Sequence, residues 1–174
     1  MDKLPTTAPP GSNQAAEIRP LVAGDLPGAK RVIDGTGLFP SEMLDEMVSA
    51  YLAGTAGEEF WLTAADADGP VGLAYCAPER MTEGTWNTLL IAVHPERQGQ
   101  GAGRALMRRV EEELAGRGGR LLLVETSGLP EFDGTRAFYR GLGYEEEARI
   151  RGFYRAGEDK VVLRKALPAP EAAG

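Results

Sequence analysis

The sequence is poor in the residues that build disulfides and multi-histidine metal sites. Among its 174 residues it has one cysteine, Cys76, and one histidine, His94. A single cysteine excludes a disulfide within the chain and fits a reducing, cytoplasmic setting. A single histidine excludes a zinc site built from several histidines, and we expect no bound metal. Cys76 lies in an apolar segment, so we expect a buried thiol rather than a nucleophile.

Positive charge and long apolar runs are also scarce. Acidic residues outnumber basic residues 26 to 19, which gives a net charge of −7. This balance disfavours nonspecific binding to nucleic acid and suits a cationic acceptor such as an amine, although solubility alone would also account for it. No segment approaches the roughly 20 apolar residues of a membrane helix, and the N-terminus has no apolar signal-peptide core. We therefore expect a cytoplasmic protein, and the sequence leaves open whether it forms oligomers.

The chain has the length of one domain with a substantial core. Residues 1–16, which contain several prolines, predict a flexible arm, and residues 168–174 predict a frayed tail. Residues 17–167 then form a single domain without internal repeats. Apolar periodicity and turn residues predict strands over 17–20, 60–64, 71–77, 89–93, 121–124, 144–150 and 160–164. The same patterns predict helices over 26–34, 43–52, 102–114 and 134–142.

The most informative stretch is the glycine-rich turn between the strand 89–93 and the helix 102–114. Residues 98–103 read Gln-Gly-Gln-Gly-Ala-Gly, so side chains are absent at alternate positions just where a helix begins. The free amides of a first helical turn and the positive end of the helix dipole attract anions. We predict a phosphate or diphosphate site here, within a strand–helix–strand unit whose two strands are parallel. A glycine-rich surface turn without a ligand is the alternative.

Known phosphate-binding motifs differ in how well they fit this turn. Arg104-Ala105 follows the last glycine, which excludes the Lys-Ser/Thr ending of a Walker A motif. The glycine spacing differs from that of the dinucleotide fingerprint, and a kinase glycine loop would lead into a strand. The pattern Gln/Arg-x-x-Gly-x-Gly/Ala, filled by Gln98, Gly101 and Gly103, follows a strand that ends in Ala-Val. It resembles the acetyl-CoA motif of the GNAT family of N-acetyltransferases.

A second signature lies nearer the C-terminus. Residues 138–144, Phe-Tyr-Arg-Gly-Leu-Gly-Tyr, are similar to the Tyr-x-x-x-Gly-Phe motif of the same family, with Tyr144 in place of phenylalanine. Residues 149–159 are similar to the RimI-like branch, whose members acetylate protein N-termini. The resemblance spans about residues 85–165. It implies an α/β (α+β) fold, with a mixed, mostly antiparallel twisted sheet of about six or seven strands, a parallel β-α-β core and about four helices.

The resemblance also implies roles for individual residues. The backbone of Ile91, Ala92 and Val93 would bind the pantetheine arm of acetyl-CoA. The turn would hold the diphosphate through Gln98, Gly99, Gln100, Gly101, Ala102, Gly103 and Arg104. Tyr139 would donate a proton to the departing thiolate, which a phenol can do when the geometry is right. The alternative for Tyr139 is an amphipathic aromatic residue at the edge of the core.

The general base is where the sequence departs from the family pattern. One branch has a glutamate at the position of Asn87, which cannot accept a proton, and the RimI-like branch has one at the position of Leu123. Glu125 faces the same side of a strand as Leu123, so we take it as the candidate base; a strand-end carboxylate facing water is the alternative. A weaker candidate is Glu83. Candidate substrate contacts are Phe39, Trp86 and Asn87.

Taken together, these patterns predict an acetyl-CoA-dependent N-acetyltransferase that transfers the acetyl group directly to an amine in a ternary complex. The acceptor is a small amine or a protein α-amine. At pH 7 roughly a tenth of an α-amine is neutral, against about one in two thousand lysines, so lysine is the harder substrate. The alternative from another class is a noncatalytic acyl-CoA-sensing module, which would keep the glycine turn and have no need of Tyr139.

Overall fold

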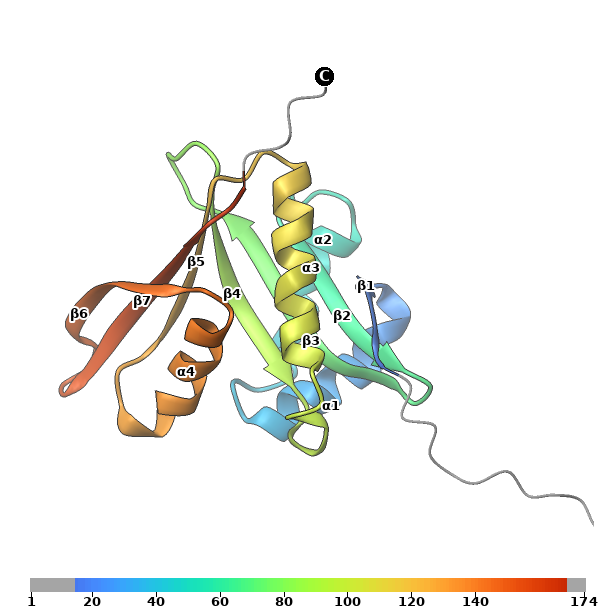
Figure 1. The fold of residues 1–174 in the computed structure, drawn as a ribbon. Helices are drawn as coiled ribbons and strands as arrows, with labels where there is room; N and C mark the ends of the chain where they lie inside the picture. The colour runs from blue at the N-terminus through green and yellow to red at the C-terminus, as the bar shows by residue number, and fades with distance from the viewer. Residues whose placement is uncertain (1–14, 169–174) are drawn as a thin grey trace, which may run out of the picture.

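The computed structural model describes residues 15–168, which form a seven-stranded sheet with helices on both faces (Figure 1). Apart from residues 15, 16 and 168, the predicted arm and tail lie outside the described residues. The strands are β1 (Glu17–Pro20), β2 (Phe60–Asp66), β3 (Gly69–Pro78), β4 (Thr85–Val93), β5 (Leu121–Ser127), β6 (Glu145–Arg155) and β7 (Glu158–Ala166). The helices are α1 (Leu26–Thr36), α2 (Met43–Leu52), α3 (Ala102–Gly116) and α4 (Asp133–Gly141).

The sheet has the order β1-β2-β3-β4-β5-β7-β6. Strands β4 and β5 are parallel, and every other neighbouring pair is antiparallel. Helix α3 connects these two strands. Parallel neighbours need such a crossover, whereas antiparallel neighbours can be joined by a tight turn. The mixed, mostly antiparallel sheet with one parallel β-α-β unit and four helices confirms the fold that the sequence predicted.

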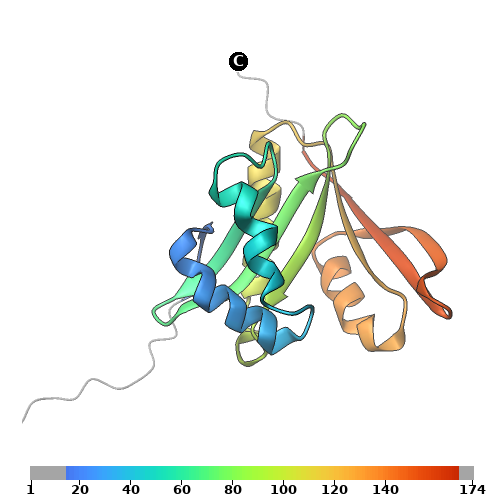
Figure 2. The same cartoon turned by 180° about the vertical axis from the view of Figure 1, so that it is seen from behind.

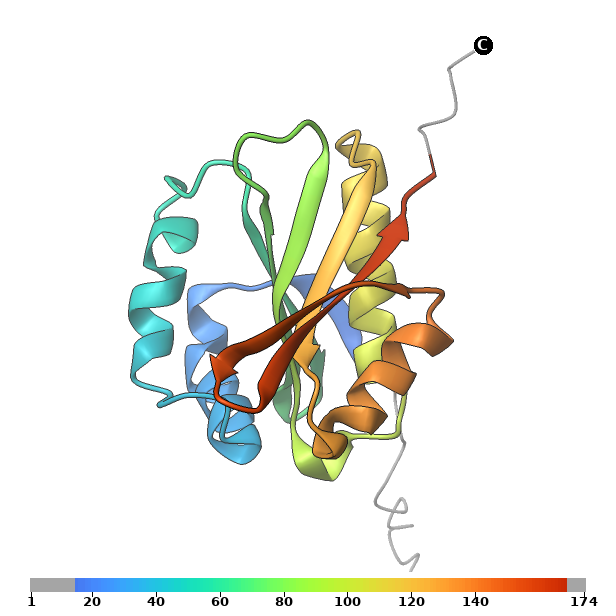
Figure 3. The ribbon, with the colours of Figure 1, turned by 90° about the vertical axis from the view of Figure 1, so that its left-hand side faces the viewer.

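Two helical layers cover the sheet. Helices α1 and α2 lie on one face, and α3 lies on the other with α4 beside it, as the views from behind and from the side show (Figures 2 and 3). Helix α3 packs through Leu106, Val110 and Leu114, which recur every four residues and form one apolar stripe. Ile33 and Leu44 belong to the second apolar cluster, under α1 and α2. Within residues 15–168, no helix combines the length and the apolar character that crossing a membrane requires.

Strands β4 and β5 pair over only part of their length. The ladder joins residues 85–88 of β4 to residues 121–124 of β5, and beyond it the two strands diverge (Figure 1). Leu89 follows directly and forms a bulge, because Tyr75 of β3 pairs with Leu90 and Cys76 pairs with Thr88. A bulge bends its strand and ends regular pairing. The last part of β4, Leu89–Val93, is therefore not paired with β5, and its backbone edge on that side is free of strand hydrogen bonds.

Candidate functional site

A cleft of about 530 Å³ opens where the end of β4 meets the glycine turn and α4. It is lined by Ile91, Val93, Arg97, Gln98, Gly99, Gly101, Ala102, Gly103, Arg104, Gly134, Thr135, Phe138 and Tyr139. Most of the predicted cofactor-binding residues and the predicted proton donor thus border one cavity. Both sequence signatures, about forty positions apart in the chain, meet there.

The glycine turn presents backbone rather than side chains to this cleft. Gly99 has φ of 73° and Gly101 has φ of 93°, a left-handed conformation that residues with a Cβ rarely adopt. Gly101 is the residue before α3, and no side chain caps the N-terminus of that helix. The N-terminal residues of α4, Gly134 and Thr135, line the same cleft. Two helix N-termini that converge on one cavity favour an anionic ligand there.

The arginines near the turn differ in how they are engaged. Arg97 pairs with Asp66 at 2.7 Å and with Asp68 at 3.4 Å, so much of its charge is already neutralised. Arg104 lines the cleft, is exposed and forms no ion pair with any of residues 15–168. Arg108, one helical turn further along α3, is exposed and does not border the cleft. Arg104 is therefore the cation best placed to meet a phosphate.

The end of β4 is tied to the turn by Gln98, whose Nε2 donates a hydrogen bond to the carbonyl oxygen of Val93 over 3.1 Å. Ile91 and Val93 face the cleft, whereas Ala92 points to the other side of the sheet and is 3 % exposed. This alternation follows from the two-residue period of a strand. Gln100 turns away from the cleft, and its Nε2 donates to the carbonyl oxygen of Glu96 at 3.3 Å.

Tyr139 lies on α4 and is 4 % exposed, with its ring at the wall of the cleft. It packs edge-on against Phe138 and Tyr144, with ring centroids 5.2 Å and 5.7 Å apart. Burial disfavours the tyrosinate and raises the pKa of Tyr139 above its usual value, so the phenol stays protonated. No residue in the described chain hydrogen-bonds to this hydroxyl, which leaves it available to a ligand in the cleft.

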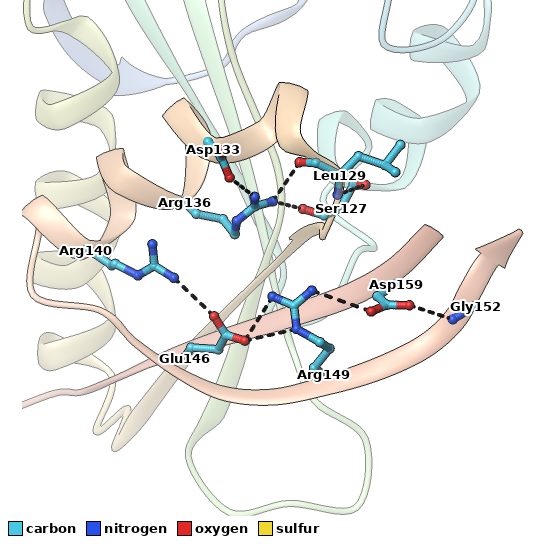
Figure 4. Close-up of polar contacts among 9 residues, drawn as sticks. All are labelled: Ser127, Leu129, Asp133, Arg136, Arg140, Glu146, Arg149, Gly152 and Asp159. Atoms are coloured by element: carbon cyan, nitrogen blue, oxygen red, sulfur yellow. Dashed lines mark hydrogen bonds and ion pairs between the residues drawn. The ribbon is translucent and has the colours of Figure 1, made fainter. Parts of the chain in front are cut away.

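The position of α4 is set by Arg136, which is 5 % exposed (Figure 4). Its guanidinium donates to the carbonyl oxygens of Ser127 and Leu129 and to the carboxylate of Asp133. These bonds join the first turns of α4 to the end of β5. Because Tyr139 follows Arg136 by one helical turn, the same bonds fix the place of the phenol.

A second polar network links α4 to the β6–β7 hairpin. Glu146 of β6 accepts from Arg140 of α4 at 3.1 Å and from Arg149 at 3.2 Å (Figure 4). Arg149 lies 3.5 Å from a carboxylate oxygen of Asp159, and that carboxylate also accepts from the amide of Gly152 at 2.9 Å. These charged side chains are between 27 % and 52 % exposed, so their ion pairs contribute little to stability and serve mainly to orient the hairpin.

The remaining predicted site residues lie outside the 530 Å³ cleft. Glu125 of β5 forms an ion pair with Lys160 of β7 at 2.8 Å. Trp86 is buried in the core against Phe60, 6.1 Å between ring centroids, and Phe39 is half-buried against the cluster under α1 and α2. Asn87 is buried at the start of β4 and lines a different cleft.

Three residues that line the cleft escaped the sequence reasoning: Gly134, Thr135 and Phe138. Gly134 and Thr135 lie in the first turn of a predicted helix, where free amides are expected. Phe138 belongs to the second signature, which gave it no role. Across residues 15–168, no group of three or more His, Cys, Asp and Glu side chains is arranged to hold a metal ion.

Comparison with known proteins identifies the family. The family model of the acetyltransferase (GNAT) domain matches residues 56–146, more than half of the 174 residues. The chain belongs to the GNAT family of acetyltransferases. Membership confirms the predicted enzyme class, and both sequence signatures fall within or next to the matched span.

Solved structures of GNAT proteins share the fold of this acetyltransferase. A protein from Desulfovibrio desulfuricans assigned to the GNAT family is 36 % identical over 88 % of this chain and 100 % of its own, with a TM-score of 0.82. A ribosomal-protein-alanine N-acetyltransferase from Brucella melitensis is 21 % identical over 87 % of this chain and 99 % of its own, with a TM-score of 0.71.

A third GNAT-like structure, from Salmonella typhimurium, is described with its cofactor acetyl-CoA. It is 17 % identical over 91 % of this chain and 98 % of its own, with a TM-score of 0.73. At such low identity, the Brucella and Salmonella proteins show a common fold and no more. A search of curated protein sequences finds no match to this GNAT chain.

Proposed function

We propose that this acetyltransferase moves the acetyl group of acetyl-CoA directly to an amine in a ternary complex. The single observation that carries the proposal is the 530 Å³ cleft, which the glycine turn, the uncovered end of β4 and Tyr139 all line. Each part suits a different portion of a long, anionic acyl thioester.

The residues of the cleft fit acetyl-CoA in order. The amides of the turn from Gly99 to Arg104 and the N-terminus of α4 would hold the diphosphate, with Arg104 supplying positive charge. Backbone groups of Ile91–Val93, which β5 does not cover, would bind the amides of the pantetheine arm as a neighbouring strand would. The related Salmonella structure with acetyl-CoA supports this choice of cosubstrate.

The chemistry then needs a proton donor near the sulfur. As the neutral amine attacks the thioester carbonyl carbon, the carbon–sulfur bond breaks, and Tyr139 donates its proton to the leaving thiolate. The acylated nitrogen then gives up its surplus proton, which restores the Tyr139 phenol. Burial raises the pKa of Tyr139, so the phenol carries the proton that it must donate. The same burial makes it a weaker acid, so the transfer requires the hydroxyl within hydrogen-bonding reach of the sulfur.

The acceptor is a protein α-amine or a small amine. The RimI-like C-terminal signature suits the first, whereas a likeness of fold at 21 % identity does not choose between them. We keep Glu125 as a candidate base. Its carboxylate pairs with Lys160 at 2.8 Å, and this ion pair must open before Glu125 can take a proton from an amine.

The proposal is tested by incubating the protein with acetyl-CoA and a panel of small amines and peptide N-termini while free thiol is measured. We expect thiol release that depends on both substrates and on Tyr139. If coenzyme A binds, as calorimetry would show, and no acceptor is ever acetylated, the protein is an acyl-CoA-sensing module and the catalytic assignment fails.

A further inference from the structure

A second cleft, of about 480 Å³, lies at the start of β4, at the end of the strand away from the glycine turn. Its polar lining comes from separate parts of the chain. Glu59 precedes β2, Tyr75 belongs to β3, Glu79 follows β3, and Asn87 lies on β4. We name this cavity the carboxylate cleft.

Two carboxylates in this cleft are held by neutral groups. The hydroxyl of Tyr75 donates to Oε2 of Glu59 at 2.8 Å, and Nδ2 of Asn87 donates to Oε1 of Glu79 at 2.9 Å. Within residues 15–168 neither glutamate forms an ion pair. By contrast, Glu111 and Glu125 each bind a lysine, at 2.7 and 2.8 Å. Hydrogen bonds from neutral groups therefore hold the carboxylates of Glu59 and Glu79 in position, and no cationic side chain of the described chain pairs with them.

The buried amide of Asn87 offers a further acceptor. Asn87 is 3 % exposed, and its Oδ1 receives no hydrogen bond from any described residue. A buried acceptor without a donor is costly, and a ligand carrying N–H groups would satisfy it. Glu58 and Arg80 also line the cleft, so its charge is three carboxylates against one guanidinium. The whole cavity is complementary to a cation that donates several hydrogen bonds.

The carboxylate cleft also lies in the right place for an acceptor. Leu89, the bulge residue, is part of its lining and marks the point where β4 stops pairing with β5. An acyl chain lying along Ile91–Val93 from the glycine turn would run toward Leu89. Val93 and Leu89 are about 13 Å apart along a strand, the scale of an extended pantetheine arm.

We propose that the carboxylate cleft binds the acceptor, and that the acceptor is a small amine with at least two positive charges. This inference rests on the proposed acetyltransferase function. One ammonium group stays paired with Glu59. The reacting ammonium releases its proton to Glu79, and the neutral nitrogen then forms the bond to the thioester carbonyl carbon. The carbon–sulfur bond breaks, and the thiolate takes the proton of Tyr139. The surplus proton of the acylated nitrogen then passes to the tyrosinate, which leaves a neutral amide and restores the phenol.

The experiment compares amines that differ by one charge. We measure kcat/KM for n-butylamine, 1,4-diaminobutane and spermidine with the wild type and with Glu59→Gln and Glu79→Gln. Glu145→Gln is the matched control, because Glu145 is exposed on β6, loses the same charge and lines neither cleft. The wild type should prefer 1,4-diaminobutane to n-butylamine by roughly tenfold, the order expected for one partly buried ion pair.

Glu59→Gln and Glu79→Gln should each reduce that preference to about threefold or less and leave the KM for acetyl-CoA unchanged. The control Glu145→Gln should keep the wild-type preference. Equal rates for n-butylamine and 1,4-diaminobutane, or a peptide N-terminus preferred to both, would overturn the inference and leave the proposed function standing. If no amine reacts although coenzyme A binds, the proposed function fails. Calorimetry with spermidine then decides: binding that Glu59→Gln and Glu79→Gln abolish supports the cleft, and no binding overturns it.

Discussion

The ring of Tyr139 packs edge-on against the ring of Tyr144, with 5.7 Å between their centroids, yet the two hydroxyls are engaged differently. Tyr144 donates to Oε1 of Glu111 at 2.9 Å, and Lys165 binds the other oxygen of that carboxylate at 2.7 Å. Tyr144 is therefore committed to a structural network, whereas the hydroxyl of Tyr139 is left for the cleft. The pair allows the catalytic assignment to be tested with a neighbouring tyrosine as control.

Replacing Tyr139 by phenylalanine removes the proposed proton donor and keeps the ring. We expect kcat to fall roughly a hundredfold, the low end of general acid catalysis, with the affinity for acetyl-CoA unchanged. Tyr144→Phe should leave kcat within a few-fold and cost about 1 kcal/mol of unfolding free energy, the worth of its hydrogen bond. Steady-state thiol release and urea unfolding measure both. Undiminished turnover in Tyr139→Phe would refute the assignment.

Gly101→Ala tests the conformation of the glycine turn. Because Gly101 has φ of 93°, an added Cβ strains the backbone by about 1–2 kcal/mol and shifts the amides that follow. We expect the KM for acetyl-CoA to rise about tenfold or more. Gly116→Ala is the control, since Gly116 lies at the end of α3 and its Cβ would meet nothing within 4 Å. An equal effect of both substitutions on KM would argue against a phosphate site at the turn.

Arg104 and Arg108 separate a phosphate contact from general charge. Both are exposed on α3, and only Arg104 lines the cleft. We expect Arg104→Gln to weaken acetyl-CoA binding about three- to tenfold, with a smaller loss at high salt because the interaction is screened. Arg108→Gln should change binding by less than about twofold. Isothermal calorimetry at two salt concentrations provides the measurement, and equal losses in the two variants would contradict the proposed contact.

Stability should fall at alkaline pH through Cys76. Burial raises the pKa of its thiol from 9.0 to about 12. The folded chain then holds a proton that the unfolded chain releases, so this contribution to stability is complete below pH 9 and is lost as the pH rises toward 12. Tyr75, whose pKa burial raises from 10.0 to about 12, acts in the same direction from pH 10 upward.

Urea unfolding of the wild type and of Cys76→Ala between pH 8 and 11 measures this effect. The variant loses some stability throughout because of the cavity it creates, and its unfolding free energy should fall less steeply above pH 9. Parallel pH dependences in the two proteins would exclude Cys76 as the source.

Local patterns made much of the fold predictable, and long-range pairing explains what they missed. The stripe of Leu106, Val110 and Leu114 identified α3, and the glycines before it identified the turn, because both signals lie within one short stretch. The predicted strand 89–93 is in fact β4, which begins at Thr85. The added residues are mostly polar, and their strand conformation depends on pairing with β3 and β5, which a local pattern does not contain.

The candidate site was likewise predictable only where the signal is local in the sequence. The two-residue period of the strand placed Glu125 on the same face as Leu123. The lysine that pairs with Glu125 comes from β7, and the sequence around Glu125 does not indicate that β7 pairs with β5. Glu59 and Glu79 are unremarkable in the sequence, since each lies in a polar turn. Only the packing of β3 and β4 together with the loop after α2 brings them to one cleft. The base role of Glu125 stays a prediction beside the proposed role of Glu79.

The most direct test of the account is a crystal structure of the protein with coenzyme A. We expect the diphosphate on the backbone amides of residues 99–104, the pantetheine arm along Ile91–Val93, and the sulfur within hydrogen-bonding distance of the Tyr139 hydroxyl. A diphosphate bound elsewhere, or a sulfur that the Tyr139 hydroxyl cannot reach, would contradict it.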